Sequence, residues 1–87
     1  MILRHQIRVD DNWTPIQHCG PVLHVGSRLM GVVEFWTEDN DAEPESVTRW
    51  YRVYGTGHHT DGTYVGTTYD GGTSDLVWHL HVTTDPQ

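Results

Sequence analysis

The residues best suited to binding chemistry form the run Tyr54-Gly55-Thr56-Gly57-His58, directly after an expected strand. Two glycines within three residues allow a tight turn that brings backbone N–H groups together, and such a turn can hold an anion. No helical pattern follows, so neither the dinucleotide-binding fingerprint nor the phosphate-binding P-loop applies. Gly-Thr-Gly also occurs as plain turn geometry. The run is therefore a candidate anion-binding loop with a purely structural alternative.

Two of the seven histidines, His79 and His81, are spaced for a shared metal ion. Residues two apart on a strand lie on one face with their roots about 6.5–7 Å apart, and imidazole is a common metal ligand. A third ligand would have to come from His58, His59 or an acidic residue of a neighbouring loop. The alternative is that the two histidines lie on a solvent-exposed polar face. Because no third ligand is defined, we expect neither a metal site nor another cofactor.

The sequence carries no recognisable catalytic signature. Its three serines, Ser27, Ser46 and Ser74, lie in expected turns or in an acidic stretch without a nucleophile motif. Cys19 follows His18, but adjacency along the chain does not by itself make a catalytic pair. No spacing selects two carboxylates as general acid and base. We therefore expect a non-enzymatic protein.

Four tryptophans, at positions 13, 36, 50 and 78, are more than a core of this size needs. Exposed Trp and Tyr beside Arg are typical of a recognition surface for a protein or a stacked base. The alternative is a Trp-rich core. Adding the aromatic and histidine candidates to the glycine loop gives the full set of candidate binding residues: Trp50, Tyr54, Gly55, Thr56, Gly57, His58, Tyr64, Trp78 and His79.

Short strands must position these residues. Apolar and polar residues alternate with period two over residues 3–9, 48–54 and 76–82, and residues 63–69 favour strands by composition. Segments 22–25 and 29–37 flank Gly26-Ser27-Arg28, which predicts a hairpin, whereas residues 10–21 are expected to be turn and loop. Both faces of segment 29–37 are partly apolar, as in a central strand.

The absence of helical spacing completes the fold prediction. No window of 11 or more residues places apolar residues three and four apart. We therefore predict an all-β fold of five to six antiparallel strands, arranged as a small barrel or as a two-sheet sandwich.

Length and charge limit the classes of function. The chain has 87 residues and a formal net charge of −7, from 12 acidic residues and 5 arginines. This length predicts a single domain over residues 1–87, small enough to gain stability from a ligand or a homodimer. The excess of acids argues against binding to nucleic acid or to an anionic membrane. Five of the acids lie in residues 38–46, which we expect to be an exposed loop.

Several features predict an intracellular protein. The sequence has neither an apolar stretch of membrane-spanning length nor a signal-peptide pattern, and its single cysteine cannot close an internal disulfide. A reducing compartment is consistent with this cysteine content. The seven histidines also predict that acidification from pH 7 to about 5.5 moves the net charge most of the way to zero and lowers solubility.

Four motifs together carry a resemblance to a known family. In chain order they are Gly20-Pro21-Val22-Leu23-His24-Val25, Tyr54-Gly55-Thr56-Gly57-His58, Tyr64-Val65-Gly66-Thr67 and Val77-Trp78-His79. The chain resembles a family of small, functionally uncharacterised proteins encoded by bacteriophages. This resemblance implies a viral protein located in the cytoplasm of an infected host cell, and it implies no particular activity.

These observations lead to one preferred function and three alternatives. We expect a small phage-encoded protein that binds and modulates a host protein. The main alternative is a protein that sequesters a nucleotide signal and so counters host defence, in which residues 55–58 hold phosphate, Arg49 or Arg52 supplies charge, and an aromatic residue stacks on the base. A metal enzyme at His79 and His81 and a minor virion component are the other two alternatives.

Overall fold

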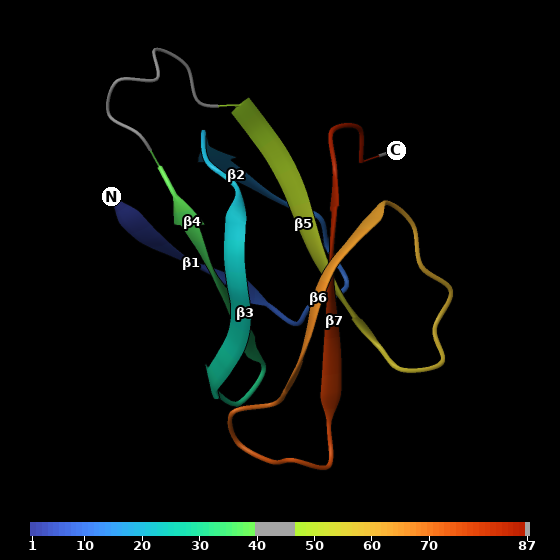
Figure 1. The fold of residues 1–87 in the computed structure, drawn as a ribbon. Coiled ribbons are helices and arrows are strands. Elements are labelled where there is room, and N and C mark those ends of the chain that lie inside the picture. Colours follow the sequence, from blue (N-terminus) through green and yellow to red (C-terminus); the bar gives the residue numbers. More distant parts are fainter. Residues whose placement is uncertain (40–46, 87) are drawn as a thin grey trace.

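The computed structural model describes residues 1–39 and 47–86, which form seven β-strands. The strands are β1 (Ile2–Arg8), β2 (Thr14–His18), β3 (Val22–Leu29), β4 (Val32–Glu38), β5 (Val47–Gly55), β6 (Thr63–Tyr69) and β7 (Val77–Thr83). They form a three-stranded sheet in the order β1-β4-β3 and a four-stranded sheet in the order β2-β5-β7-β6 (Figure 1). All pairings are antiparallel. The all-β prediction is confirmed, and the arrangement is a sandwich rather than a closed barrel.

Strand β2 lies within residues 10–21, so the expectation of turn and loop there is wrong for Thr14–His18. It is an edge strand of the four-stranded sheet and pairs with β5, so that Pro15 stands opposite Trp50. Proline has no N–H to donate, and an edge strand tolerates it because one side of the strand needs no partner. This additional strand explains why the described residues contain more strands than the expected five or six.

The predicted hairpin exists, but its turn lies further along the chain than expected. Strands β3 and β4 are joined at Met30 and Gly31, and Gly31 has a φ of +72°, a value that favours glycine. Gly26, which was expected to lie in the turn, is instead inside β3 and faces Glu34 of β4. Strand β4 is central in its sheet, as both of its partly apolar faces predicted.

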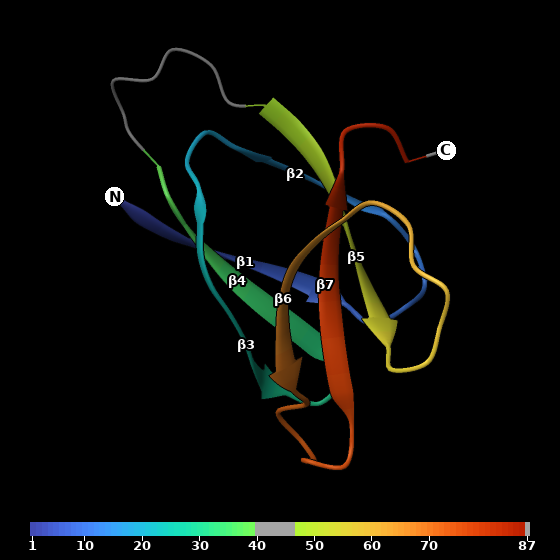
Figure 2. The same cartoon turned by 45° about the vertical axis from the view of Figure 1, so that its right-hand side comes forward.

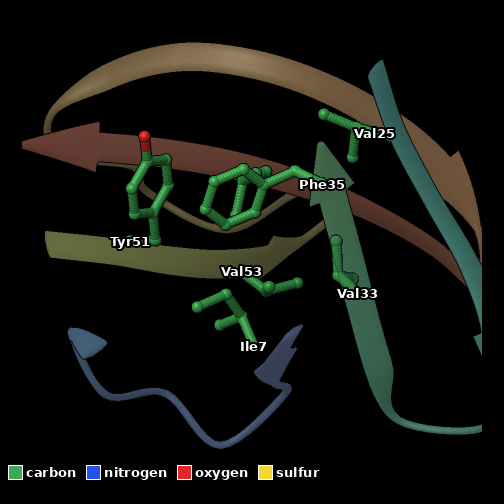
Figure 3. Close-up of a cluster of buried hydrophobic side chains, with 7 residues drawn as sticks. Ile7, Val25, Val33, Phe35, Tyr51 and Val53 are labelled. Carbon is green, nitrogen blue, oxygen red and sulfur yellow. The ribbon is translucent and has the colours of Figure 1, made fainter. Parts of the chain in front are cut away.

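The core fills the space between the two sheets (Figure 3). Phe35 of β4 and Tyr51 of β5 face each other across it, with ring centroids 4.3 Å apart. The buried apolar cluster consists of Ile7, Val25, Val33, Phe35, Tyr51, Val53 and Leu80. The members on β1, β5 and β7 occupy alternate positions of their strands, so each strand turns these side chains toward the core.

The two sheets approach each other closely along the β3–β6 side. These strands lie side by side in both views (Figures 1 and 2) although they belong to different sheets. A Cβ atom added to Gly66 of β6 would lie only 2.6 Å from Cγ2 of Val25 on β3. Gly66 therefore permits this approach by lacking a side chain.

A single carboxylate joins the β3–β4 turn to the loop between β6 and β7. Oδ1 of Asp70 accepts hydrogen bonds from the Gly31 N–H at 2.8 Å and from the Trp78 indole N–H at 2.9 Å. Its Oδ2 accepts from the N–H groups of Gly72 at 2.8 Å and Thr73 at 3.2 Å. These hydrogen bonds to the ionised form, led by that from Gly31, lower the pKa of Asp70. Asp70 thus holds one end of the sandwich together and orients Trp78.

The acidic stretch 38–46 is only partly covered by the structure. Glu38 is the exposed last residue of β4, but Asp39 is buried, so the expectation of an exposed loop is wrong at Asp39. Residues 40–46, which include Ser46, lie outside the described residues. In the part of the chain that the structure describes, no helix is long and apolar enough to cross a membrane.

Candidate functional site

The glycine run after β5 forms a tight turn. The N–H of His58 donates to the Gly55 carbonyl at 3.4 Å, and Gly57, the third residue of the turn, has a φ of +92°. A positive φ at the third position is the mark of a type II turn, which explains the glycine there. Because the His58 N–H is engaged within the turn, it is not free to hold an anion. This hydrogen bond favours the interpretation of the Gly-Thr-Gly run as a plain turn over its interpretation as an anion-binding loop.

Gly55 has a different role, because two rings lie against its backbone. A Cβ atom added at Gly55 would lie 3.3 Å from Cδ2 of His58 and 3.6 Å from Cζ3 of Trp78. Trp78 stands opposite Gly55 in the β5–β7 pairing. The missing side chain of Gly55 therefore lets the imidazole and the indole approach the end of β5 together.

A hollow opens beside these rings, and we call it the Trp78 hollow. It has a volume of about 450 Å³ and is lined by Val9, Asp11, Arg52, Val53, Tyr54, Gly55, His58, His59 and Trp78. A second hollow of about 360 Å³ adjoins it and shares Gly55, His58 and Trp78. Four predicted candidates, Tyr54, Gly55, His58 and Trp78, thus come together around one concave surface.

Three other candidates lie in a chain of hydrogen bonds on the outer face of the four-stranded sheet. The Tyr64 hydroxyl bonds Oγ1 of Thr67 at 2.6 Å, and Oγ1 of Thr67 bonds Nδ1 of His79 at 2.9 Å. Nε2 of His79 bonds Oγ1 of Thr56, also at 2.9 Å. Thr67 was not predicted as a member, and its place opposite His79 depends on the β6–β7 register.

The candidate residues therefore form two groups, but the Trp78 hollow is not confined to one face of the sheet. Tyr54 pairs with His79 and shares its face, so the hollow reaches both faces where β5 extends beyond its pairing with β2. Trp78 packs against the core, whereas its neighbour His79 faces outward, since successive residues of a strand point to opposite faces. Gly57 belongs to the turn that connects the two groups. Trp50 is half-buried between Pro15 of β2 and Thr83 of β7 and does not line the Trp78 hollow.

The two histidines of the metal hypothesis are both engaged in the protein structure. Both ring nitrogens of His79 are hydrogen-bonded to threonines. His81 is buried between Tyr54 and Tyr64, with edge-to-face ring contacts at centroid distances of 5.1 and 5.8 Å. The alternative assumed that His81 lies on a solvent-exposed face, and the burial of His81 contradicts this. Burial lowers the pKa of His81. Among residues 1–39 and 47–86, no group of three or more His, Cys, Asp or Glu is placed to hold a metal ion.

The aromatic side chains do not form an exposed tryptophan patch. All four tryptophans are half-buried, and Tyr54 is buried beneath the edge of Trp13 at a centroid distance of 6.3 Å. The exposed aromatics are Tyr64 and Tyr69.

A polar cluster inside the sandwich was not predicted as a site. Nδ1 of His18 donates to the Gly20 carbonyl at 2.9 Å, which leaves Nε2 to accept from the Tyr51 hydroxyl at 2.6 Å. The ring of His5, bonded to Thr37 at 2.9 Å, lies with its centroid 5.8 Å from that of His18. Burial lowers the pKa of both histidines and raises that of Tyr51 to about 12. The sequence offered one indication of this cluster: His5 occupies an apolar position in the alternating pattern of residues 3–9 and could therefore have been expected to point inward.

Fold and site together define a small β-sandwich protein with a concave, partly apolar surface at one end. A family model described as "Domain of unknown function (DUF7352)" matches residues 1–87, and the chain belongs to this family. No curated protein and no solved structure shows significant similarity to the chain. The resemblance to a functionally uncharacterised family is confirmed to this extent.

Proposed function

We propose that this chain is a non-enzymatic binding protein that engages a host protein in a phage-infected cell and modulates its activity. The observation that carries the proposal is the gathering of Tyr54, Gly55, His58 and Trp78 around the Trp78 hollow. The phage origin and the location in the host cytoplasm are part of the proposal and are supported by the motif resemblance described above.

The chemistry of the Trp78 hollow suits recognition. Val9, Val53 and the indole of Trp78 supply apolar walls, while Arg52 and His58 supply polar groups. A concave, largely apolar surface with a few convergent polar groups is the usual form of a binding site. A partner that inserts one side chain there would gain most of its affinity from that contact.

The contacts on the outer face favour binding over catalysis. Thr56 bonds His79, which resembles the contact of a nucleophile with a base. However, the other nitrogen of His79 bonds the hydroxyl of Thr67 and not a carboxylate. A carboxylate is the group that stabilises the imidazolium formed when a histidine removes a proton from a nucleophile. The Thr56–His79 contact therefore lacks the carboxylate that would help His79 to activate Thr56 as a nucleophile.

A comparison of capture by matched variants tests the proposed function. Tagged wild type, His58→Ala and the control Arg8→Gln are each incubated with lysate of the host, since His58 lines the Trp78 hollow and exposed Arg8 lies on β1. We expect one host protein to be retained by the wild type and Arg8→Gln and lost by His58→Ala, and the purified pair to reproduce this order. Equal retention by all three, or retention by none, contradicts the proposal.

A nucleotide-like small molecule is the second candidate partner, and Arg52 favours it. This cation lines the Trp78 hollow and has no carboxylate partner in residues 1–39 and 47–86. Native mass spectrometry of the untagged protein, before and after exposure to small-molecule extract of infected cells, tests this candidate. A discrete added mass supports it, and an unchanged mass removes it.

A further inference from the structure

Arg52 is the one arginine on the four-stranded sheet that lines the Trp78 hollow, and its charge is not compensated within the described residues. Arg4 and Arg28 approach Glu34, and Arg49 donates to the His18 carbonyl at 3.3 Å. Arg52 has no carboxylate within 4.0 Å in the part of the chain that the structure describes, and its Nε is buried without a hydrogen-bond partner. A partly buried cation without a partner is costly, and an incoming anion would remove that cost.

A rigid aromatic platform holds the guanidinium of Arg52. Its Cζ lies 4.8 Å from the centroid of the Tyr54 ring, within the range of a cation–π contact. Tyr54 is fixed in turn, because its hydroxyl accepts from the Asp61 N–H at 3.3 Å and its ring makes an edge-to-face contact with His81. When a guanidinium lies on a ring, the N–H donors along its edge remain available, and their fork matches a carboxylate or a phosphate.

The other walls of the Trp78 hollow suit a flat ring. Arg52 and Trp78 point to opposite faces of the sheet, and both line the hollow because it extends around the edge of β5 that β2 leaves unpaired. The rings of His58 and Trp78 lie against Gly55, and the indole orientation of Trp78 is fixed by its N–H bond to Asp70 at 2.9 Å. Asp11 at the exposed rim offers a carboxylate to a hydrogen-bond donor of the ligand. A volume of about 450 Å³ accommodates one ring and its substituents.

We propose that the Trp78 hollow binds an aromatic ring that carries an anionic group, with Arg52 pairing with the anion and with His58 and Trp78 contacting the ring. This inference rests on the proposed binding function and names the chemistry of the ligand. Two sources offer that chemistry, a free mononucleotide and a phosphorylated tyrosine displayed by a partner protein.

Titration with a simple probe tests the inference directly. Amide and side-chain N–H resonances of ¹⁵N-labelled protein are followed as phenyl phosphate is added, with inorganic phosphate and benzyl alcohol as probes that each lack one half of the chemistry. We expect phenyl phosphate to shift the indole N–H of Trp78 and the Nε–H of Arg52 and to bind at least about tenfold more tightly than either half. Equal binding of all three probes, or shifts confined to other regions, would overturn the inference.

Variants of Arg52 show whether the charge or its geometry matters. Arg52→Gln is expected to weaken phenyl phosphate binding about tenfold, and Arg52→Lys, which keeps a point charge without the fork, by a smaller factor. Arg8→Gln, on the other sheet, is the matched control and should bind as the wild type does. Circular dichroism confirms that each variant is folded. Unchanged affinity in Arg52→Gln overturns the assignment.

Two further ligands identify the source and separate this inference from the proposed function. Tighter binding of adenosine monophosphate than of a phosphotyrosine peptide identifies a free nucleotide, and the reverse order identifies a displayed side chain. If neither binds while capture of a host protein still depends on His58, the ligand chemistry is wrong and the proposed function stands. If a ligand binds but no host protein is captured, the inferred site stands and the host-protein partner does not.

Discussion

Gly57 shows how strongly a single backbone angle can specify a residue. Its φ of +92° lies in a region that side chains disfavour, and nothing crowds the position of its absent Cβ. We expect Gly57→Ala to cost about 1–2 kcal/mol through backbone strain alone, which lowers Tm by roughly 5–10 °C in a chain of this size. Thermal unfolding followed by circular dichroism measures the change.

Gly26 provides the matched control for Gly57. A Cβ at Gly26 would lie 3.5 Å from Trp36, which is ordinary contact, and the φ of Gly26 is not positive. Gly26→Ala should therefore leave the free energy of unfolding within about 0.5 kcal/mol of the wild-type value. If the two variants lose the same stability, the turn geometry at Gly57 is not the cause.

The histidine pair inside the sandwich predicts a loss of stability on acidification. Burial holds the pKa of both His5 and His18 below the ordinary value. The neighbouring His18 lowers the pKa of His5 further, and Arg49 lowers that of His18. The unfolded chain therefore binds protons at a higher pH than the folded chain does. Stability is fully present above the unfolded pKa of about 6.5 and is lost as pH falls through the folded values. We expect Tm to be clearly lower at pH 5 than at pH 7.5.

Replacement of the two histidines separates this effect from general acid sensitivity. The double variant His5→Gln/His18→Gln should show a flatter dependence of Tm on pH, even if its Tm at pH 7.5 is lower. His59, which is 89% exposed, is the control, and His59→Gln should retain the wild-type slope. An unchanged slope in the double variant would assign the pH dependence to other groups, with buried His81 the first to examine.

At the scale of elements, Asp70 connects a turn of one sheet to a loop and a strand of the other. Four N–H donors converge on its carboxylate, from Gly31, Gly72, Thr73 and the indole of Trp78. Asp70→Asn replaces one accepting oxygen by a donor that faces other donors. We expect Tm to fall by several degrees and the indole N–H resonance of Trp78 to shift, while Asp75→Asn at an exposed position of the same loop changes neither. Equal Tm values for the two variants would show that Asp70 does not secure this end.

The elements differ in how far their sequences reveal them. Residues 3–9 and 76–82 alternate clearly, and they correspond to β1 and β7, which run one residue earlier and one residue later than expected. Strand β2 was missed because a proline such as Pro15 usually interrupts strand pairing. An edge strand tolerates proline, but the edge position of β2 follows from the tertiary structure and cannot be read from the sequence. The β3–β4 turn was misplaced because Gly26 resembles a turn residue, whereas only Gly31 has the positive φ.

The sequence suggested individual candidate residues, but it did not predict which of them lie close together. Strand periodicity already places Trp78 and His79 on opposite faces, so their separation could have been foreseen. The contact of Thr67 with His79 depends on a register that includes a shift between Tyr64 and Gly66, and period-two patterns do not reveal such shifts. The burial of His81 depends on Tyr54 and Tyr64 coming together from two strands.

For the whole molecule, a net charge of −7 does not prevent the recognition of an anion. Among the described residues, Arg4 and Arg28 on the three-stranded sheet both approach the carboxylate of Glu34, so each of these cations has an anionic neighbour. Arg52 lies on the other sheet and has no such partner within residues 1–39 and 47–86. The local potential near a binding group depends on its own neighbours and not on the total charge. We therefore expect the acidity to disfavour the binding of extended polyanions and to leave the binding of a small anionic group possible.

The approach of the two sheets at Gly66 yields a prediction about the molecule as a whole. A methyl group at Gly66 would overlap Val25 at 2.6 Å, so Gly66→Ala must push β3 and β6 apart and should cost about 1–3 kcal/mol. Val25→Ala removes the overlapping methyl groups, so the double variant should lose at least about 0.5 kcal/mol less than the sum of the single losses. Urea unfolding of all four proteins measures this coupling. Additive losses would mean that Gly66 serves the local bulge in β6 and not the contact between the sheets.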